Sequence, residues 1–525
     1  MIFKISSSLV TVCEHCNSVV ARGDRRLEDL GKVAALVETN SPLQLGLKGT
    51  YKGKSFELVG RAQYAHSAGG VWDEWYAAFS NGKWGWLAEA QGRFYLTFGR
   101  NVEDRSKLPR AEEMVAGGEL QFEGVGALTI GEVGIAEAKS AQGEIPYKFE
   151  PNAEHRFADL YGENGAFATF DYSESEPRVY LGQEVTLRDI GIADNVVAPD
   201  VEPREINAIK VSCPQCGGAL TLHAPDETKR VCCPSCAALL DADKGDLRYL
   251  NSLTFGKVKP LIPIGAVGKL FGVEYTLIGM LRRSVTEEGT DYFWSEYLLY
   301  NPREGFRWLV YNDGHWSFVS PASPADVRVS GTTASYKGRS FKLFQEGIAR
   351  VRYVIGECYW KVEIGEEAAT RDFIAPPDML STERSTSYSM PQKRKAKNDE
   401  SFSEEPSGSE INISIGTYVR REVVEEAFKV GNLPTSWKIA PNQPYPVDSK
   451  LYVWWGVFAG ALVLLNVLFS SGILKQKVDQ FFFFLCLAIL SAVPVCALIY
   501  RFFYESSRWQ DSAFSPYVSY ASDDE

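Results

Sequence analysis

The strongest constraint on this chain is a pair of long stretches, near its C-terminal end, that contain no charged side chain. They run from Leu451 to Leu474 and from Phe481 to Tyr500. A helix of about 20 apolar residues is long enough to cross the roughly 30 Å hydrocarbon core of a bilayer. Aromatic residues gather at their outer ends, as is typical of the lipid–water boundary. We therefore predict a two-helix transmembrane hairpin over residues 451–504, followed by an acidic tail over 505–525.

The remainder of the chain is expected to lie in the cytosol, because the first residues do not form a signal peptide. Basic residues flank the hairpin more heavily than its short connection: Lys438, Lys450, Arg501 and Arg508, against Lys475 and Lys477. Basic flanks favour the cytosolic side. We predict a multi-pass protein with two spans, with both termini and the bulk of the chain in the cytoplasm. The spans carry few polar groups, so the hairpin is interpreted as an anchor or a partner-binding surface.

Composition predicts β-rich domains in front of the hairpin. The chain has 525 residues, whereas single hydrophobic cores rarely exceed about 250 to 300 residues, so we expect several domains. Aromatic residues make up 13% of the chain and glycine contributes 45 residues, a balance that favours strands and turns. A formal charge of −12 argues against a nucleic-acid partner, since binding phosphates requires a basic face.

Four cysteines in two Cys-x-x-Cys motifs predict a zinc ribbon over residues 205–245. The motifs are Cys213/Cys216 and Cys233/Cys236. Four thiolates with this spacing suit a tetrahedral structural zinc ion, and the glycine pair after Cys216 is expected to supply positive φ angles. A closed four-cysteine site leaves no open coordination position, so we expect no catalysis at the metal.

Other residues offer alternatives to these ligands. Cys232 is adjacent to Cys233 and could compete with it, and His223 is a weaker substitute. Cys13 and Cys16 form half of a similar motif within residues 1–40, which we expect to be an N-terminal knuckle. Three interpretations of that half-motif stay open: a remnant, a site that borrows a ligand from elsewhere in the chain, or a metal shared across a dimer.

Two long segments on either side of the ribbon repeat one another. The matching positions are Gly49–Gly60 with Gly268–Gly279, Trp72-x-Glu74 with Trp294-x-Glu296, Trp86 with Trp308, Gly143-Glu144 with Gly356-Glu357, and Gly182 with Gly416. Apolar and polar residues alternate between turns, which favours antiparallel strands. We predict a mainly β fold, with one β-rich domain over 41–200 and a second over 246–440. A short helix at 421–430 ends the second domain, and a disordered loop at 391–410 interrupts it.

Both copies contain a Trp-x-Glu-Trp/Tyr motif, a Trp-Leu pair before a turn, and Gly-Glu-x-x-Tyr/Trp; the second copy adds Pro376-Pro377 and Leu380-Ser381. In these motifs the chain resembles bacterial proteins of the family called domain of unknown function 4178. The resemblance covers most of residues 41–440. It implies no established catalysis, and it implies a link to membrane stress through the proteins that accompany relatives.

Four glutamates recur in the two copies and raise the possibility of an enzyme: Glu74, Glu296, Glu144 and Glu357. Two carboxylates about 5 to 10 Å apart in a cleft can act as general acid and base. Each of these glutamates adjoins tryptophan or glycine, however, and can instead accept from an indole N–H or from turn amides. We favour that structural role and assign no catalytic residue.

Taken together, these features predict a membrane-anchored cytosolic interaction or scaffold protein with a protein partner. Two alternatives stay open. One is an enzyme that uses the repeated carboxylates on an unknown substrate. The other is an accessory subunit of a membrane complex that acts through the hairpin.

Overall fold

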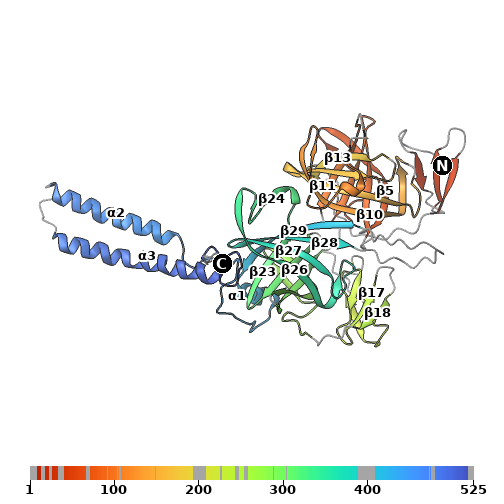
Figure 1. Ribbon diagram of the computed structural model, residues 1–525. Helices are drawn as coiled ribbons and strands as arrows, with labels where there is room; N and C mark the ends of the chain where they lie inside the picture. Colours follow the sequence, from red (N-terminus) through yellow and green to blue (C-terminus); the bar gives the residue numbers. More distant parts are fainter. Residues whose placement is uncertain are drawn as a thin grey trace, which may run out of the picture.

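The computed structural model is mainly β, as the sequence predicts, and ends in two long helices (Figure 1). It describes residues 9–12, 18–22, 27–32, 41–66, 71–90, 93–102, 105, 108–147, 149–174, 176–192, 209–224, 228–242, 247–252, 258–287, 289–302, 304–387, 408–471, 473 and 479–517. Most of the strands belong to two antiparallel barrels of the same design.

The first barrel has eight strands, each antiparallel to the next. In ring order they are β5 (Lys54–His66), β6 (Val71–Phe79), β7 (Trp84–Ala90), β8 (Arg93–Arg100), β13 (Arg178–Val185), β12 (Ala166–Asp171), β11 (Glu154–Gly162) and β10 (Gly126–Ile145). Pairing of β10 with β5 closes the ring. Two short strands, β4 (Lys48–Tyr51) and β9 (Glu119–Phe122), extend β5 and β10 as hairpins.

The second barrel repeats this ring. Its strands are β20 (Val273–Glu287), β21 (Thr290–Asn301), β22 (Gly305–Asn312), β23 (His315–Pro321), β29 (Gly408–Val419), β28 (Asp378–Ser387), β27 (Glu367–Ala375) and β26 (Arg339–Cys358). Pairing of β26 with β20 closes it. Three short strands lie beside the ring: β19 (Val267–Leu270), β24 (Val327–Ser330) and β25 (Thr333–Tyr336).

Two predictions about the second domain can be compared with this barrel. Of the loop predicted at 391–410, residues 391–407 lie outside the described residues, and 408–410 begin β29. The predicted helix at 421–430 is confirmed as α1 (Arg421–Phe428). The residue after its last turn, Lys429, caps the helix with a left-handed φ of 53°.

Apolar side chains of the first barrel pack on its outer surface, beneath covering loops. Leu58, Leu87 and Leu96 pack with Ile190, and Leu128 packs with other buried residues of the β10–β13 face. Successive side chains on a strand point to opposite faces, so the residues between them face inward. Contacts between strands that are not neighbours confirm this orientation: the rings of Trp84 on β7 and Tyr180 on β13 are 6.5 Å apart.

Each barrel closes where two glycines cross. Gly60 on β5 lies opposite Gly143 on β10, and Gly279 lies opposite Gly356 in the second barrel. Gly143 and Gly356 have φ angles of 73° and 82°. A Cβ atom on Gly60 would lie 1.9 Å from the carbonyl oxygen of Glu144, and the equivalent distance at Gly279 is 2.2 Å. This close approach explains why glycine occupies these positions in both repeats.

A small β hairpin pairs with each barrel just beyond this crossing. On the first barrel it is β1 (Val10–Val12) with β2 (Ser18–Arg22), and on the second β16 (Arg230–Cys232) with β17 (Ala238–Asp241). Thr11 lies opposite Glu144 as Val231 lies opposite Glu357. Strands β1 and β2, which flank the N-terminal half-motif, therefore dock on the first barrel in the same way as β16 and β17, which flank Cys233 and Cys236, dock on the second. Cys13 and Cys16 themselves lie outside the described residues.

Three further strands accompany these hairpins. They are β3 (Leu27–Lys32) beside β2, β18 (Arg248–Ser252) beside β17, and the separate pair β14 (Ile209–Ser212) and β15 (Ala219–Leu222).

The C-terminal helices are α2 (Lys450–Ser470) and α3 (Gln480–Arg508), which lie side by side and project from the barrels (Figure 1). Both are long and apolar enough to cross a membrane. No residue of α2 is buried, as expected of helices that face lipid. The helices touch through polar groups at two levels: Trp455 Nε1 lies 3.3 Å from Ser491 Oγ, and Asn466 Nδ2 lies 3.5 Å from Gln480 Oε1.

We predict that Gly60→Ala destabilises the first barrel by about 1 to 3 kcal/mol or more, because the new methyl group meets backbone that cannot move independently of strand pairing. Thermal unfolding of the detergent-solubilised protein measures the effect. Gly99→Ala on β8 is the matched control, since a Cβ there meets no atom within 4 Å. Equal melting temperatures for the two variants would contradict the proposed crossing.

Candidate functional site

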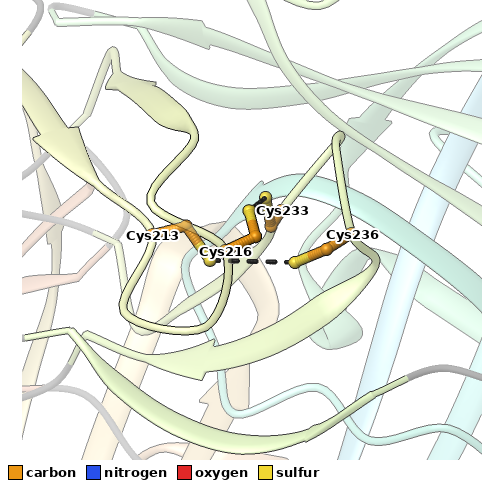
Figure 2. Close-up of side chains that lie close together, drawn as sticks. All are labelled: Cys213, Cys216, Cys233 and Cys236. Carbon is orange, nitrogen blue, oxygen red and sulfur yellow. Dashed lines mark hydrogen bonds between the residues drawn. The ribbon is translucent and has the colours of Figure 1, made fainter.

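The side chains of the four cysteines predicted to bind metal lie close together (Figure 2). In the sequence they fall between the strands of the first barrel and those of the second. Their sulfur atoms all lie within 4.8 Å of one another, with 3.8 Å between Cys213 and Cys236 and 3.9 Å between Cys216 and Cys233. Metal–sulfur bonds of about 2.3 Å in a tetrahedron place the sulfurs about 3.8 Å apart. The cluster therefore fits a metal ion in size and in ligand type.

The two Cys-x-x-Cys loops have matching backbones. Gly217 N–H donates to Cys213 O at 2.8 Å, and Ala237 N–H donates to Cys233 O at 2.9 Å. Gly217 has the positive φ expected from the sequence, 71°, and Ala237 has a φ of 59°. The positive φ angle of Ala237 was not expected from the sequence. Ala237 nevertheless lies four residues after Cys233, as Gly217 lies four residues after Cys213, so the spacing alone could have indicated it. Gly218 instead donates its N–H to Cys216 Sγ at 3.4 Å.

Cys232 and His223, the alternative ligands, are not among the four residues of this cluster. The Cys232 side chain is buried against Leu281 and Val351 of the second barrel, and this burial raises the pKa of its thiol to about 12. His223 donates its backbone N–H to Glu357 at 2.6 Å. Both residues therefore help to join the ribbon to the barrel.

Among the repeated glutamates, Glu357 attaches the ribbon to the second barrel. Besides His223, it accepts from the backbone N–H of Ala224 at 2.9 Å and from Thr228 Oγ1 at 2.7 Å. Burial raises the pKa of this carboxyl group, although the donors oppose the shift. Glu144 is buried at the equivalent position on β10.

The other repeated glutamates face the inside of the barrels. Trp72 Nε1 lies 3.3 Å from Glu74 Oε1, and Trp294 Nε1 lies 2.6 Å from Glu296 Oε1. These contacts confirm the indole bonds expected from the sequence. The two glutamates of one repeat thus have different environments, one inside the barrel and one at its contact with a hairpin.

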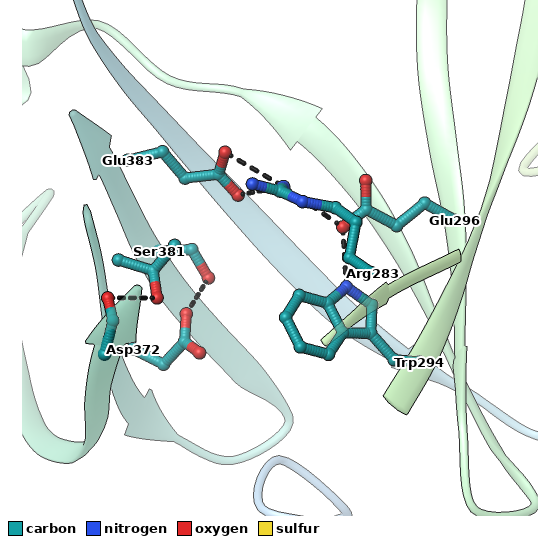
Figure 3. A network of polar contacts seen from close by, with 8 residues as sticks. Arg283, Trp294, Glu296, Asp372, Ser381 and Glu383 are labelled. Carbon is teal, nitrogen blue, oxygen red and sulfur yellow. Dashed lines mark hydrogen bonds and ion pairs between the residues drawn. The ribbon is translucent and has the colours of Figure 1, made fainter. Parts of the chain in front are cut away.

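Inside the second barrel, a buried arginine joins two carboxylates from opposite walls (Figure 3). Arg283 Nη1 on β20 lies 3.3 Å from Glu296 on β21, and 2.8 and 3.0 Å from the two oxygens of Glu383 on β28. Nearby, Ser381 Oγ donates to Asp372 at 2.5 Å, and burial raises the pKa of Asp372 to about 6.

The first barrel holds a similar acidic set without the arginine. Asp159 accepts from Thr169 Oγ1 at 2.7 Å, as Asp372 accepts from Ser381. Burial, reinforced by the charge of Glu132, raises the pKa of Asp159 to about 8. Burial and the nearby charge of Asp171 raise the pKa of Glu74 to about 7, against the opposing indole bond.

Acidic groups also meet where the barrels join. Strand β10 pairs with β29 across the two barrels, which places Glu132 opposite Glu410. His66 Nε2 lies 2.8 Å from Glu132 Oε1, and this partner raises the pKa of His66 although burial opposes it. Burial and the charge of Glu132 raise the pKa of Glu410 to about 7.

Sequence reasoning missed Arg283, Glu383 and the two aspartates inside the barrels. A signal was present: extending the repeat alignment from Gly143/Gly356 reaches Asp159 and Asp372 in register. Arg283 escaped because its counterpart in the first repeat is a tyrosine, Tyr64.

The repeat corresponds to a known family. Residues 44–187 and 263–392 each match the model for Domain of unknown function (DUF4178), and together they make up more than half of the chain. The chain belongs to the DUF4178 family. Neither a curated protein nor a solved structure matches it. Both DUF4178 matches begin after the hairpin that docks on each barrel, and the second ends before β29, which completes the ring.

We predict that the protein loses stability as the pH rises from about 4 to 8. Asp159, Glu74 and Glu410 have raised pKa values in the folded protein, so folding favours their protonated forms. Their contribution is complete below the pKa of the unfolded chain and is lost as the pH rises through the folded values. Each such group contributes up to about 1.4 kcal/mol per pH unit.

Asp159→Asn should reduce this pH dependence and raise the melting temperature at pH 8, since the amide can still accept from Thr169. Thermal unfolding of the full chain between pH 4 and 8 is the measurement. Exposed Glu123→Gln is the control and should follow the unmodified protein. An Asp159→Asn profile parallel to the unmodified one would contradict the assignment.

Proposed function

We propose that this protein is a membrane-anchored interaction protein whose barrels bind a protein partner on the cytosolic side. In this proposal the α2–α3 hairpin spans the membrane, with both ends of the chain inside. A zinc ion in the four-cysteine cluster holds the ribbon against the second barrel. The observation that carries the proposal is the attachment of α3 to that barrel.

The end of α3 is built into the second domain. Arg508 is buried and donates to the carbonyl oxygens of Ala440 at 3.2 Å and Pro441 at 2.7 Å. One turn earlier, Tyr504 donates its hydroxyl to Pro444 O at 2.9 Å. A buried guanidinium that loses its acceptors is costly, so this end of the helix has a fixed position.

The residues after α3 continue the attachment. The rings of Trp509 and Phe344 lie 5.4 Å apart, and Ser512 Oγ donates to Phe344 O at 2.5 Å. Helix α3 is continuous from its apolar part to Arg508, and the residues after Tyr500 rise only about 12 Å. This geometry favours a barrel held close to the membrane surface, where a scaffold would present it to a partner.

Zinc is the metal that we assign to the cluster, because four thiolates in a closed tetrahedral site are typical of structural zinc. Purified full-length protein should carry about one zinc per chain, measured by inductively coupled plasma mass spectrometry. Cys233→Ala should remove the zinc, since three thiolates bind it far more weakly. Cys232→Ala, the adjacent buried cysteine, is the matched control and should retain it. The reverse result would show that the ligands are assigned in the wrong register.

The interaction role predicts a partner that binds without the hairpin. We would capture the full-length protein from solubilised membranes, beside a chain ending at Ser449, and compare copurifying proteins by quantitative mass spectrometry. A partner recovered with both forms is the expected result. A partner recovered only with the full-length form would assign binding to the hairpin, and no partner with either form would contradict the proposal.

A further inference from the structure

A short strand pairing joins the two barrels. Strand β10 of the first barrel lies antiparallel to the start of β29 of the second (Figure 1), and two residue pairs define the register: Glu132 with Glu410, and Val133 with Ser409. Farther along, from residue 414 to 419, β29 pairs with β23 of its own barrel instead. The strand contact with the first barrel is therefore confined to the first residues of β29.

Other contacts between the barrels surround this pairing. Ala116 donates its N–H to Ser409 Oγ at 3.3 Å, and the short helix η4 (Pro324–Asp326) lies against β10 and β11. Arg328 forms an ion pair with Glu163, but both side chains are largely exposed. An ion pair this exposed contributes little to stability. The charges at the β10–β29 pairing can therefore decide how firmly the barrels are joined.

Two carboxyl groups meet at the pairing. Residues directly opposite on antiparallel strands have Cβ atoms about 4.5 to 5.5 Å apart, and like charges in such a pair are destabilising. Glu132 and Glu410 form such a pair. His66 on β5 is the nearby cation, with Nε2 2.8 Å from Glu132 Oε1. A charged His66 therefore neutralises one glutamate, and a proton on Glu410 neutralises the other.

Further charged groups face this set from both barrels. On the side of the first barrel, Asp159 of β11 adds a carboxyl group that interacts with His66. On the side of the second barrel, Glu383 of β28 interacts with Glu410, but it is already bound to Arg283 at 2.8 Å. The guanidinium of the next residue, Arg384, lies against the turn that precedes β9.

The charge of the junction changes near neutral pH. Burial and the charge of Glu132 raise the pKa of Glu410 to about 7. Burial opposes a charge on His66, but the surrounding carboxylates raise its pKa above the ordinary value. As the pH rises through these values, Glu410 gains a negative charge and His66 loses a positive one. Both groups favour the joined state when protonated, so both contributions are lost in the same direction.

We propose that this junction is a pH-sensitive latch, which holds the barrels together while Glu410 and His66 carry their protons and opens the β10–β29 pairing when they lose them. Opening allows water to solvate two charged glutamates that would otherwise lie opposite each other in a poorly hydrated place. Each ring stays closed, because it is closed by the β5–β10 and β20–β26 pairings and not by the β10–β29 pairing. The first barrel can then move relative to the barrel that carries the helical hairpin.

Hydrogen–deuterium exchange of the full-length protein in detergent, followed by mass spectrometry, measures this opening. The relevant peptides cover residues 130–135 and 408–411. After correction for the intrinsic pH dependence of exchange, we expect their protection to fall by about 10-fold or more between pH 6 and 8, since each pH unit above the pKa of one group changes the equilibrium tenfold. Peptides from β6 and β7 are the internal reference and should keep their protection. Simultaneous loss in all strands would indicate global unfolding and would overturn the latch.

Two variants test the assigned groups. Glu410→Gln should keep the pairing protected at pH 8, because the amide is neutral at every pH. Glu132→Gln removes the opposing charge and should shift the loss of protection to higher pH, which provides a second test if one variant folds poorly. Exposed Glu123→Gln is the matched control and should behave as the unmodified protein does.

Constant protection of the unmodified protein between pH 6 and 8 would contradict the latch, as would an equal loss of protection in the Glu410→Gln variant. The measurement needs no protein partner, so its outcome is independent of the partner-capture experiment.

Discussion

Closure of each barrel at a pair of crossing glycines is the constraint on which the rest of the structure depends. At Gly60 and Gly143, and again at Gly279 and Gly356, two backbones approach so closely that a Cβ atom on the first glycine of either pair has no room. Once the ring is closed, alternation along each strand divides its side chains into an outer apolar set and an inner polar and aromatic set. The glutamate that follows each crossing, Glu144 or Glu357, pairs with the docked hairpin. Each barrel therefore closes next to the point where its hairpin is attached.

Charge inside the barrels distinguishes the two copies. The second barrel provides a counter-charge for its carboxylates, because Arg283 reaches from β20 to Glu383 on β28. The first has the carboxylates but a tyrosine in the arginine position. Burial of a carboxylate that has no ion-pair partner is costly. Burial accordingly raises the pKa of Glu74 and Asp159. The same fold therefore places an arginine between its inner carboxylates in one copy, whereas in the other copy burial favours the protonated carboxyl groups.

The features that could be predicted from the sequence are formed by residues close together in the chain or by motifs with a fixed spacing. The uncharged helices, the four cysteines, the short helix after β29 and the indole–glutamate contacts all depend on residues near one another in sequence. Closure of the rings could not be read in the same way, because it depends on pairing between distant strands such as β5 and β10. The arginine network was missed for another reason: a comparison of repeats finds identical residues, whereas this site depends on a position where Tyr64 and Arg283 differ.

The two barrels also differ in how they are attached, and this difference agrees with their charge. The second barrel contacts the four-cysteine ribbon through Glu357 and the end of α3 through Phe344. It lies between the helical hairpin and the first barrel (Figure 1). The first barrel joins it through the short β10–β29 pairing and a few side-chain contacts, among them Ala116 N–H to Ser409 Oγ at 3.3 Å. The barrel that carries these structural attachments is also the one with an ion-paired arginine between its inner carboxylates. The barrel with fewer attachments is the one whose inner carboxyl groups, Glu74 and Asp159, have raised pKa values, and so it is the copy in which proton uptake or loss can change the internal charge without acting on the residues that hold the anchor.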